Sequence, residues 1–430
     1  MPRHVQAAMM MAFGGAKRVL GMNGAARITI NGHELISWKD TYNKWYFRHD
    51  DEKINILESS LGVDNETIFG YKASVNSIKR RLQLDGYDLK SAKKDFDDTK
   101  KVWLMDILDT LEEHRREVGL RGHFLTPEDL YHVTEDLKVV KEANFDDWLK
   151  KMPEALRLMG KQERGWIPKR AEWDPLLYFM FSYSIGIFGT NLGFKETLFP
   201  CKQMESYAVV LLELSKDDDD CILNISGLPS NVWSDFINER GHMQASETKF
   251  YNDFLDSLEE LSTLNQENKN PLIQRMSYLN VITSMEAYLS DTMKRHVLNR
   301  HAIKRRFVEE YDIFNKNMKE KDIFGFIDGL DKKLVEAIDE ISFHSMDKVV
   351  GLFMNVLLCY FPEDKISELK SCIQLRHDIV HRNGKNTDGY VHIVTQDDVE
   401  KAIRLVHRVV EHIDKQIISG LPDDKMSIIK

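Results

Sequence analysis

Short apolar runs that alternate with polar residues mark the N-terminal part of the chain. Residues 27–30 (RITI) and 33–36 (HELI) flank the dipeptide Asn31-Gly32. Asn-Gly between two such runs is a strong signal for a β-hairpin. The runs 45–47 (WYF) and 53–57 (KINIL) extend this β-rich start. The pattern therefore predicts a sheet at the beginning of the chain.

From Ala73 onward the apolar residues recur at helical spacing. Residues 75–82 predict a short helix that Gly86-Tyr87 ends, and residues 89–116 predict a long amphipathic one. Thr126-Pro127 followed by two acids is a helix start. The stretch 176–194 carries no charge. Its glycines and polar residues favour a buried core segment over a membrane span.

The second half of the chain carries a helical pattern throughout. Apolar stripes run through residues 246–264, 281–299 and 395–417, and Thr395 with Asp398 predicts a capping box before the last of them. We therefore expect an α+β protein. A mixed α/β domain spans residues 1–225, with 1–22 as a possible extension, and an all-α bundle spans 235–420.

One stretch in this half, residues 375–385 (LRHDIVHRNGK), concentrates the candidate chemistry. Upstream apolar residues at helical spacing make it the end of a partly buried helix, and Asn383-Gly384 suits a left-handed C-cap. His377 and His381 share a face, and Arg376 lies about 140° round the helix from His381. The predicted helix end therefore carries an imidazole and a guanidinium close together.

These residue types suit the cleavage of a phosphodiester. A histidine exchanges protons near neutral pH, and an arginine holds a phosphate with a rigid fork of donors. RNA carries its own nucleophile in the 2′-hydroxyl. Spacing alone leaves open a plain alternative, in which cationic residues complement the helix dipole. Zinc on His377 and His381 is a weaker alternative, because HDIVH lacks the glutamate of HExxH and no third ligand stands out.

The run from Arg376 to His381, with four residues between them, resembles the signature of HEPN-domain ribonucleases. Residues 281–299, 342–362 and 391–417 resemble the first long helix, the middle and the last helix of that domain. The resemblance implies an all-helical domain that forms a homodimer, with two Arg/His motifs facing each other and cutting RNA without a metal or cofactor. It also implies an acidic residue near the pair, for which Glu286 is the first candidate and Asp291 the second; an ordinary salt bridge or solvated face is the alternative for Glu286.

A second resemblance concerns residues 74–96, SVNSIKRRLQLDGYDLKSAKKDF. This segment, behind a β-hairpin start, is similar to the N-terminal domain joined to HEPN or Toprim domains in bacterial conflict systems. Residues 1–22 depart from that pattern. The resemblance implies a sensing or regulatory role, with a phage-derived trigger as one candidate partner.

Charge limits where RNA could bind. The chain has a formal net charge of −10, which argues against non-specific coating of nucleic acid. Residues 292–308 contain no acid, and they are the best candidate for a phosphate-tracking surface. The alternative is a helix face paired to acids. The candidate RNA-binding residues are Lys294, Arg295, Arg300, Lys304 and Arg305, together with Arg382 and Asn383. For Asn383, a role as the helix C-cap is the alternative.

The expected function is a HEPN-type endoribonuclease that acts on tRNA, rRNA or mRNA as a toxin or anti-phage effector. His381 would move a proton of the 2′-hydroxyl or the leaving oxygen, Arg376 would stabilise the transition state, His377 would orient the pair, and Glu286 would set the charge of a histidine. A non-catalytic RNA-binding or dimerisation scaffold is the alternative. The four cysteines show no CxxC pair. They fit a reduced, cytoplasmic protein without a membrane partner.

Overall fold

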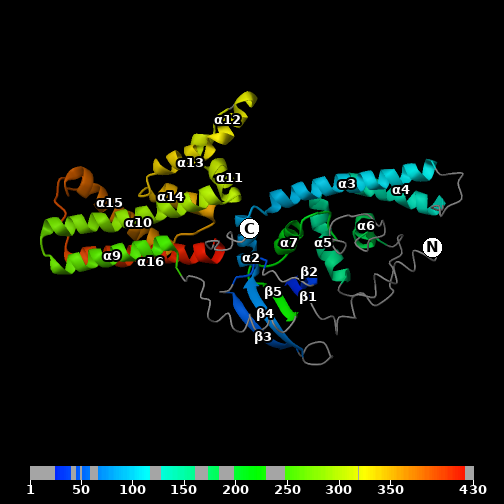
Figure 1. Ribbon diagram of the computed structural model, residues 1–430, viewed down its shortest axis with the longest axis horizontal. Helices are drawn as coiled ribbons and strands as arrows, with labels where there is room; N and C mark the ends of the chain where they lie inside the picture. Colours follow the sequence, from blue (N-terminus) through cyan, green and yellow to red (C-terminus); the bar gives the residue numbers. More distant parts are fainter. Residues whose placement is uncertain are drawn as a thin grey trace. The chain divides into compact units, whose positions relative to one another are not determined.

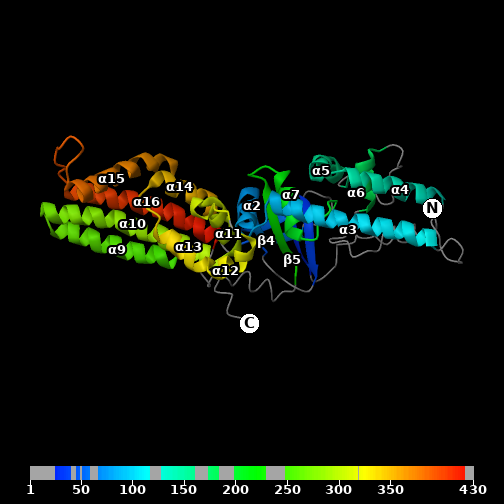
Figure 2. The ribbon, with the colours of Figure 1, turned by 90° about the horizontal axis from the view of Figure 1, so that it is seen from above.

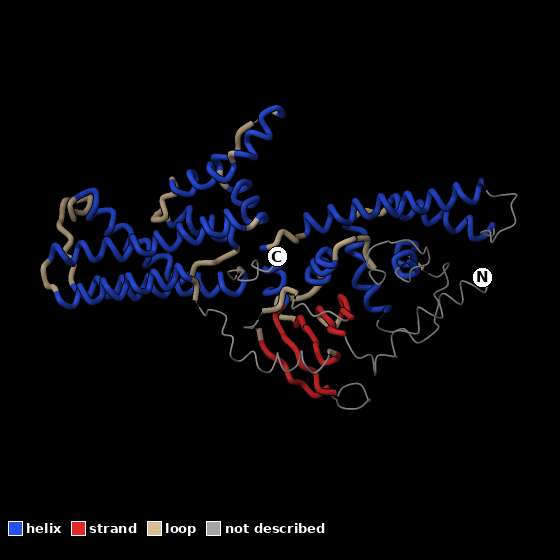
Figure 3. The backbone as a smooth tube through the Cα atoms, viewed as in Figure 1, coloured by secondary structure: helices blue, strands red, loops and turns tan. Residues whose placement is uncertain are grey.

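The computed structural model describes residues 25–39, 45–48, 51–58, 66–116, 127–159, 173–183, 198–228, 247–317 and 319–421. The chain divides into two compact units, one built on residues 1–83 and 87–241 and the other on residues 84–86 and 242–430. Figure 1 labels their elements, and Figure 3 shows that the strands gather in the N-terminal unit while the C-terminal unit is helical. The predicted α+β class, with an all-α second half, is confirmed.

The N-terminal unit contains one antiparallel sheet. Its strands are β1 (Ala25–Ile30), β2 (His33–Lys39), β3 (Glu52–Glu58), β4 (Glu66–Ser74) and β5 (Asp220–Gly227), in the spatial order β2-β1-β5-β4-β3. The predicted hairpin is confirmed: Asn31 and Gly32, at φ 47° and 76°, join β1 to β2. Positive φ at both turn positions matches the right-handed twist of paired strands, which is why Asn-Gly is favoured there.

The central strand, β5, comes from a distant part of the sequence. It pairs with β1 on one side and with β4 on the other, so it joins the β1–β2 pair and the β3–β4 pair into one sheet. The acidic residues 217–219 before it form a turn, in which Asp219 Oδ2 accepts from the Lys216 amide at 2.8 Å. Gly70 of β4 faces this strand so closely that an added Cβ would lie 1.8 Å from the Leu223 carbonyl oxygen. Only glycine fits there.

Helices complete the core of the N-terminal unit. Asp95 of α3 (Leu89–Arg116) accepts hydrogen bonds from the Lys202 and Gln203 amides just before α7 (Met204–Glu213), which satisfies backbone donors at the start of that helix. Aromatic rings of Phe96, Trp148 and Phe199 contact one another in the interior. α7 lies against β1 and β2. The helices are α2 (Val75–Leu84), α3 (Leu89–Arg116), α4 (Pro127–Glu142), α5 (Phe145–Met159), α6 (Pro175–Tyr183) and α7 (Met204–Glu213).

Residues 45–47, predicted to extend the β-rich start, are not a strand. Trp45 takes a left-handed φ of 52° in a turn, and Phe47 is buried in the core. Arg81 of α2 fixes this segment: its guanidinium donates to the Tyr46 carbonyl oxygen and to both carboxylate oxygens of Asp51, at 2.7 and 2.8 Å. The prediction failed because a tertiary contact, rather than local β propensity, sets the conformation.

The C-terminal unit is organised around α9 (Lys249–Glu267), α10 (Pro271–Asn299) and α16 (Gln396–Gly420), which lie side by side in Figures 1 and 2. Buried Asp414 of α16 ties them together by accepting from the Thr248 hydroxyl at 2.6 Å and the Tyr288 hydroxyl at 2.9 Å. Burial raises the pKa of Asp414, although these hydrogen bonds oppose the rise. The predicted capping box of Thr395 and Asp398 is present at the start of α16.

Shorter helices cover the remaining side of this bundle. The elements of the unit are α9 (Lys249–Glu267), α10 (Pro271–Asn299), α11 (His301–Glu310), η3 (Asp312–Phe314), η4 (Glu320–Asp322), α12 (Ile323–Asp328), α13 (Leu330–Asp339), α14 (Met346–Leu352), the π-helix η5 (Phe353–Leu357), α15 (Glu363–Arg382) and α16 (Gln396–Gly420). α15 packs on both α10 and α16.

Two sequence features fall partly or wholly outside the described residues. The uncharged stretch 176–194 continues beyond the end of α6, and the N-terminal residues 1–22 precede β1. Among the residues that the structure describes, no helix combines the length and the apolar character that crossing a bilayer requires.

Candidate functional site

The candidate site is built on the C-terminal end of α15. The helix stops at Arg382, and Asn383 takes the left-handed conformation, φ 51° and ψ 40°, that the sequence predicts for its cap. The Gly384 amide then donates to the Asp378 carbonyl oxygen at 3.0 Å. An added Cβ on Gly384, at φ 80°, would lie 3.3 Å from Arg275 Nη1. The turn is therefore tight, and it leaves His381 and Asn383 exposed at the helix end.

Arg376 points to α10, where it meets the predicted acidic residue. Its Nη2 lies 3.7 Å from Glu286 Oε2, and both side chains are largely buried. The other carboxylate oxygen, Oε1, lies 3.3 Å from His344 Nδ1 in the turn before α14. Glu286 thus joins the guanidinium to a histidine that the sequence did not indicate. Asp291, the second candidate, instead lines a pocket with residues of α9.

The two motif histidines lie together on α15. The ring centroids of His377 and His381 are 4.5 Å apart with an interplanar angle of 43°, as expected for residues four apart on one helix. No hydrogen bond or ion pair joins Arg376 directly to His381 among the described residues. The guanidinium faces the bundle, whereas the His381 imidazole faces solvent.

Buried Asp378 holds the helix end and the following loop in place. Its carboxylate accepts from Gln374 at 3.2 Å and from Arg382, and its Oδ2 lies 3.0 Å from His392 Nε2. Burial alone raises the pKa of Asp378, but the hydrogen bonds from His392 and Arg382 outweigh it and hold the pKa below its usual value. The carboxylate therefore stays ionised and fixes the geometry around His381.

An open groove of about 480 Å³ runs beside the motif helix, between α15 and the start of α14. His344 and Asp347 line one side of it. Lys370, Gln374, His377 and Arg382 line the other. The lining holds two cationic side chains, Lys370 and Arg382, and one carboxylate, Asp347. Arg382 is also bound to the Asp378 carboxylate beside the groove.

The predicted phosphate-tracking surface on α10 and α11 is largely paired with acids. Lys294 and Lys304 contact Asp339 and Asp331 of α13, each at 2.5 Å, and Arg305 contacts Glu309 at 3.0 Å. Arg295 is exposed, and Arg300 lies between the two helices. This arrangement corresponds to the paired face that the sequence left open as the alternative.

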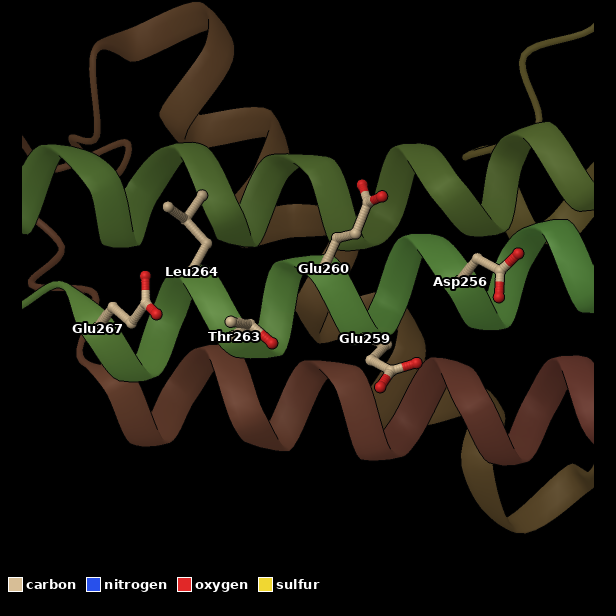
Figure 4. A pocket seen from close by; sticks show the side chains of 6 residues that line it. All are labelled: Asp256, Glu259, Glu260, Thr263, Leu264 and Glu267. Carbon is tan, nitrogen blue, oxygen red and sulfur yellow. The ribbon is translucent and has the colours of Figure 1, made fainter.

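The opposite electrostatic character marks α9. A groove of about 530 Å³ is lined by Asp256, Glu259, Glu260 and Glu267, with Thr263 and Leu264 between them. Figure 4 shows all six side chains on this one helix, with Glu260 projecting toward α10 and Glu259 toward α16. Four carboxylates repel phosphate, so an RNA path along α9 is disfavoured. Among the described residues, no three or more His, Cys, Asp or Glu side chains are placed so that they could hold a metal ion together.

Comparison with known families follows the same division of the chain. A family model described as HEPN/Toprim N-terminal domain 1 matches residues 22–249, more than half of the chain. The chain belongs to this family. A second model, described as RiboL-PSP-HEPN, matches residues 248–419, so the helical unit is a RiboL-PSP-HEPN domain. No curated protein and no solved structure matches the chain.

Three residues of this HEPN domain that contribute to the site were not singled out from the sequence. His344 and His392 each contact a carboxylate of another element, and Asp378 lies inside the motif but was not assigned a role. Asp378 could have been suspected from its position one turn before Arg382 on the same helix. His344 has no such signal, because its partner Glu286 is distant in the sequence.

Proposed function

We propose that the HEPN domain is an endoribonuclease that cleaves RNA through attack of the 2′-hydroxyl, without a metal cofactor. The observation that carries this proposal is the placement of Arg376 and His381 on one helix end, with Glu286 3.7 Å from the guanidinium and the imidazole open to solvent. A guanidinium fixed by a carboxylate and an accessible imidazole are the two groups that such a transesterification needs.

Each residue has a definite role in the proposed reaction. His381 removes the proton of the 2′-hydroxyl or protonates the leaving 5′-oxygen. Arg376 stabilises the charge on the pentacoordinate phosphorus centre. Glu286 holds the Arg376 guanidinium in orientation. His377, whose ring centroid lies 4.5 Å from that of His381, orients His381 or moves a second proton. The products are a 2′,3′-cyclic phosphate and a 5′-hydroxyl.

A homodimer is part of the proposal. Tyr390, Val391 and Ile393 are 74, 60 and 81% exposed on the loop that follows α15, and Val380 of α15 is 48% exposed. Exposed apolar side chains on the motif helix and the loop that follows it favour a protein contact over solvent. A second copy covering them would bring two motifs to one cleft, with a single-stranded or looped tRNA, rRNA or mRNA as substrate.

The proposed biological role is that of a toxin or anti-phage effector under the control of the N-terminal domain. That domain would lower the activity of the nuclease, without abolishing it, until a phage-derived trigger binds, so that basal cleavage by the full-length protein stays measurable. The family to which the chain belongs supports the pairing of the two domains, and the trigger is part of the proposal. Adding a separately prepared fragment of residues 1–241, which keeps the central strand β5 whole, to the HEPN domain should reduce cleavage; unchanged cleavage would count against restraint.

The chemistry of the product ends tests the ribonuclease proposal. Purified full-length protein is incubated with end-labelled RNA in excess chelator, and the ends are identified by their reactivity toward phosphatase and polynucleotide kinase. We expect 2′,3′-cyclic phosphate and 5′-hydroxyl ends. Ends that carry a 5′-phosphate, or cleavage that the chelator abolishes, would contradict the mechanism.

A non-catalytic RNA-binding scaffold is the second candidate. It is favoured by one observation, the absence of a direct contact between Arg376 and His381 among the described residues. Toxicity on expression separates the two functions. The nuclease predicts toxicity that His381→Ala relieves, whereas the scaffold predicts that both forms are tolerated equally.

A further inference from the structure

The groove between α14 and α15 has the features of a phosphate subsite next to the proposed cleavage position. Residues that line the groove connect it to both proposed reacting groups, Arg376 and His381. The ring centroid of His377 in one wall lies 4.5 Å from that of His381, and His344 in the other wall shares Glu286 with Arg376. A strand that passes the His381 imidazole would therefore enter this groove within one nucleotide.

The donors of the groove remain available to a ligand. Arg382 uses Nη1 to bind Asp378, and its Nη2 and Nε have no partner among the described residues. The contact between Lys370 and Asp347 lies at the surface, with side chains 48 and 84% exposed. Exposed ion pairs of this kind are weak, so an incoming phosphate could replace Asp347 at little cost.

We propose that this groove binds the backbone phosphates that flank the scissile phosphodiester in single-stranded RNA. Arg382 contacts the phosphate beside the cleavage position. Lys370, on the same helix and about 18 Å away along its axis, contacts a phosphate further along the strand, and His344 and Gln374 contact the nucleotides between them. Asp347 opposes binding, because it places the one carboxylate of the lining beside the phosphate. The identity of the ligand as RNA rests on the proposed ribonuclease function.

Binding of an RNA that cannot be cleaved tests this subsite separately from catalysis. A fluorescent 2′-O-methyl oligonucleotide lacks the free 2′-hydroxyl, and its Kd is measured by anisotropy with the full-length protein. We expect Lys370→Gln and His344→Gln to weaken binding about 3- to 10-fold, and Asp347→Asn to tighten it about threefold. Lys370→Gln should also lower the slope of log Kd against log salt by about 0.7.

Lys365→Gln is the matched control. Lys365 lies on the same helix outside the groove and contacts Asp364 and Glu368. The Lys365→Gln substitution should leave the Kd within about twofold of the wild-type value, since exposed charges far from a ligand contribute little to binding. With cleavable RNA, Lys370→Gln should raise KM and Asp347→Asn should lower it, with kcat nearly unchanged in both.

Each failure points to a different conclusion. The subsite is wrong if Lys370→Gln and Asp347→Asn both bind the oligonucleotide like wild type, or if Asp347→Asn binds it more weakly. This conclusion holds even where wild type cleaves RNA and His381→Ala does not. If the groove variants shift Kd as expected but neither wild type nor His381→Ala cleaves RNA, the subsite stands and the nuclease function falls.

Discussion

Glu286 Oε2 lies 3.7 Å from Arg376 Nη2, and this contact connects α10 to the helix that carries both motif histidines. The same carboxylate reaches His344 Nδ1 at 3.3 Å through its other oxygen. Loss of the carboxylate should therefore loosen Arg376 without removing it.

We expect Glu286→Gln to lower the rate of RNA cleavage about 10- to 100-fold, because a misoriented guanidinium stabilises the transition state poorly. Initial rates on a labelled single-stranded RNA measure the effect. Asp291→Asn is the control, since this exposed carboxylate lies on the side of α10 toward α9 and should change the rate less than about twofold. Equal losses in both variants would indicate a general effect of charge rather than the contact with Arg376.

Asp378 is expected to hold the loop after α15. Removal of its carboxylate in Asp378→Ala leaves Arg382 and His392 without their partner and frees the turn around Gly384. We expect trypsin to cut after Arg382 or Lys385 about tenfold faster in this variant, because local opening exposes the backbone. Asp388→Ala, in the same loop, should digest like wild type. Indistinguishable digestion of the two variants would overturn this role.

The stability of the HEPN domain should depend on pH through His296. Burial, with a smaller contribution from the charges of Arg300 and Arg295, lowers the pKa of this histidine to about 3 from 6.5. Below pH 6.5 the unfolded chain therefore binds a proton that the folded chain does not. Stability is full above that pH and falls as the pH decreases, by about 1.4 kcal/mol between about pH 7.5 and 5.5.

Urea unfolding of wild type and His296→Leu at these two pH values measures this contribution. The variant should lose about 1.4 kcal/mol less than wild type on acidification. His412→Leu replaces an exposed histidine of α16 and should keep the wild-type difference. A wild-type loss that His296→Leu leaves unchanged would assign the pH dependence to other groups.

The buried pair of Arg81 and Asp51 should stabilise the N-terminal unit. Both side chains are nearly inaccessible, at 4 and 8% exposure, so Arg81→Met leaves an uncompensated buried carboxylate. We expect a loss of about 3–5 kcal/mol in the free energy of unfolding. The half-exposed pair of Lys79 and Glu213 provides the comparison, and Lys79→Met should cost less than about 1 kcal/mol. Similar costs for the two variants would show that burial does not determine the contribution.

Local signals accounted for much of the fold. The hairpin at Asn31-Gly32, the long helix ending at Arg116, the cap at Asn383 and the capping box at Thr395 depend on neighbouring residues, and all of them are present. Strand β5 was not predicted, because its partners β1 and β4 lie far away in the sequence.

The candidate site shows the same limit. Helical spacing was enough to place His377 beside His381, since both residues lie on α15. Spacing could not reveal that His344 approaches Glu286, or that acids of α13 pair with Lys294 and Lys304. These contacts arise from packing between elements, which a single sequence does not encode at fixed intervals.

The central claim is that Arg376 and His381 carry out RNA cleavage. The most direct measurement compares initial cleavage rates of wild type, Arg376→Ala and His381→Ala on one single-stranded RNA, with equal helical content confirmed by circular dichroism. We predict that each substitution lowers the rate at least about 100-fold, because it removes proton transfer or transition-state stabilisation. A folded His381→Ala variant that cleaves RNA as fast as wild type would contradict the account.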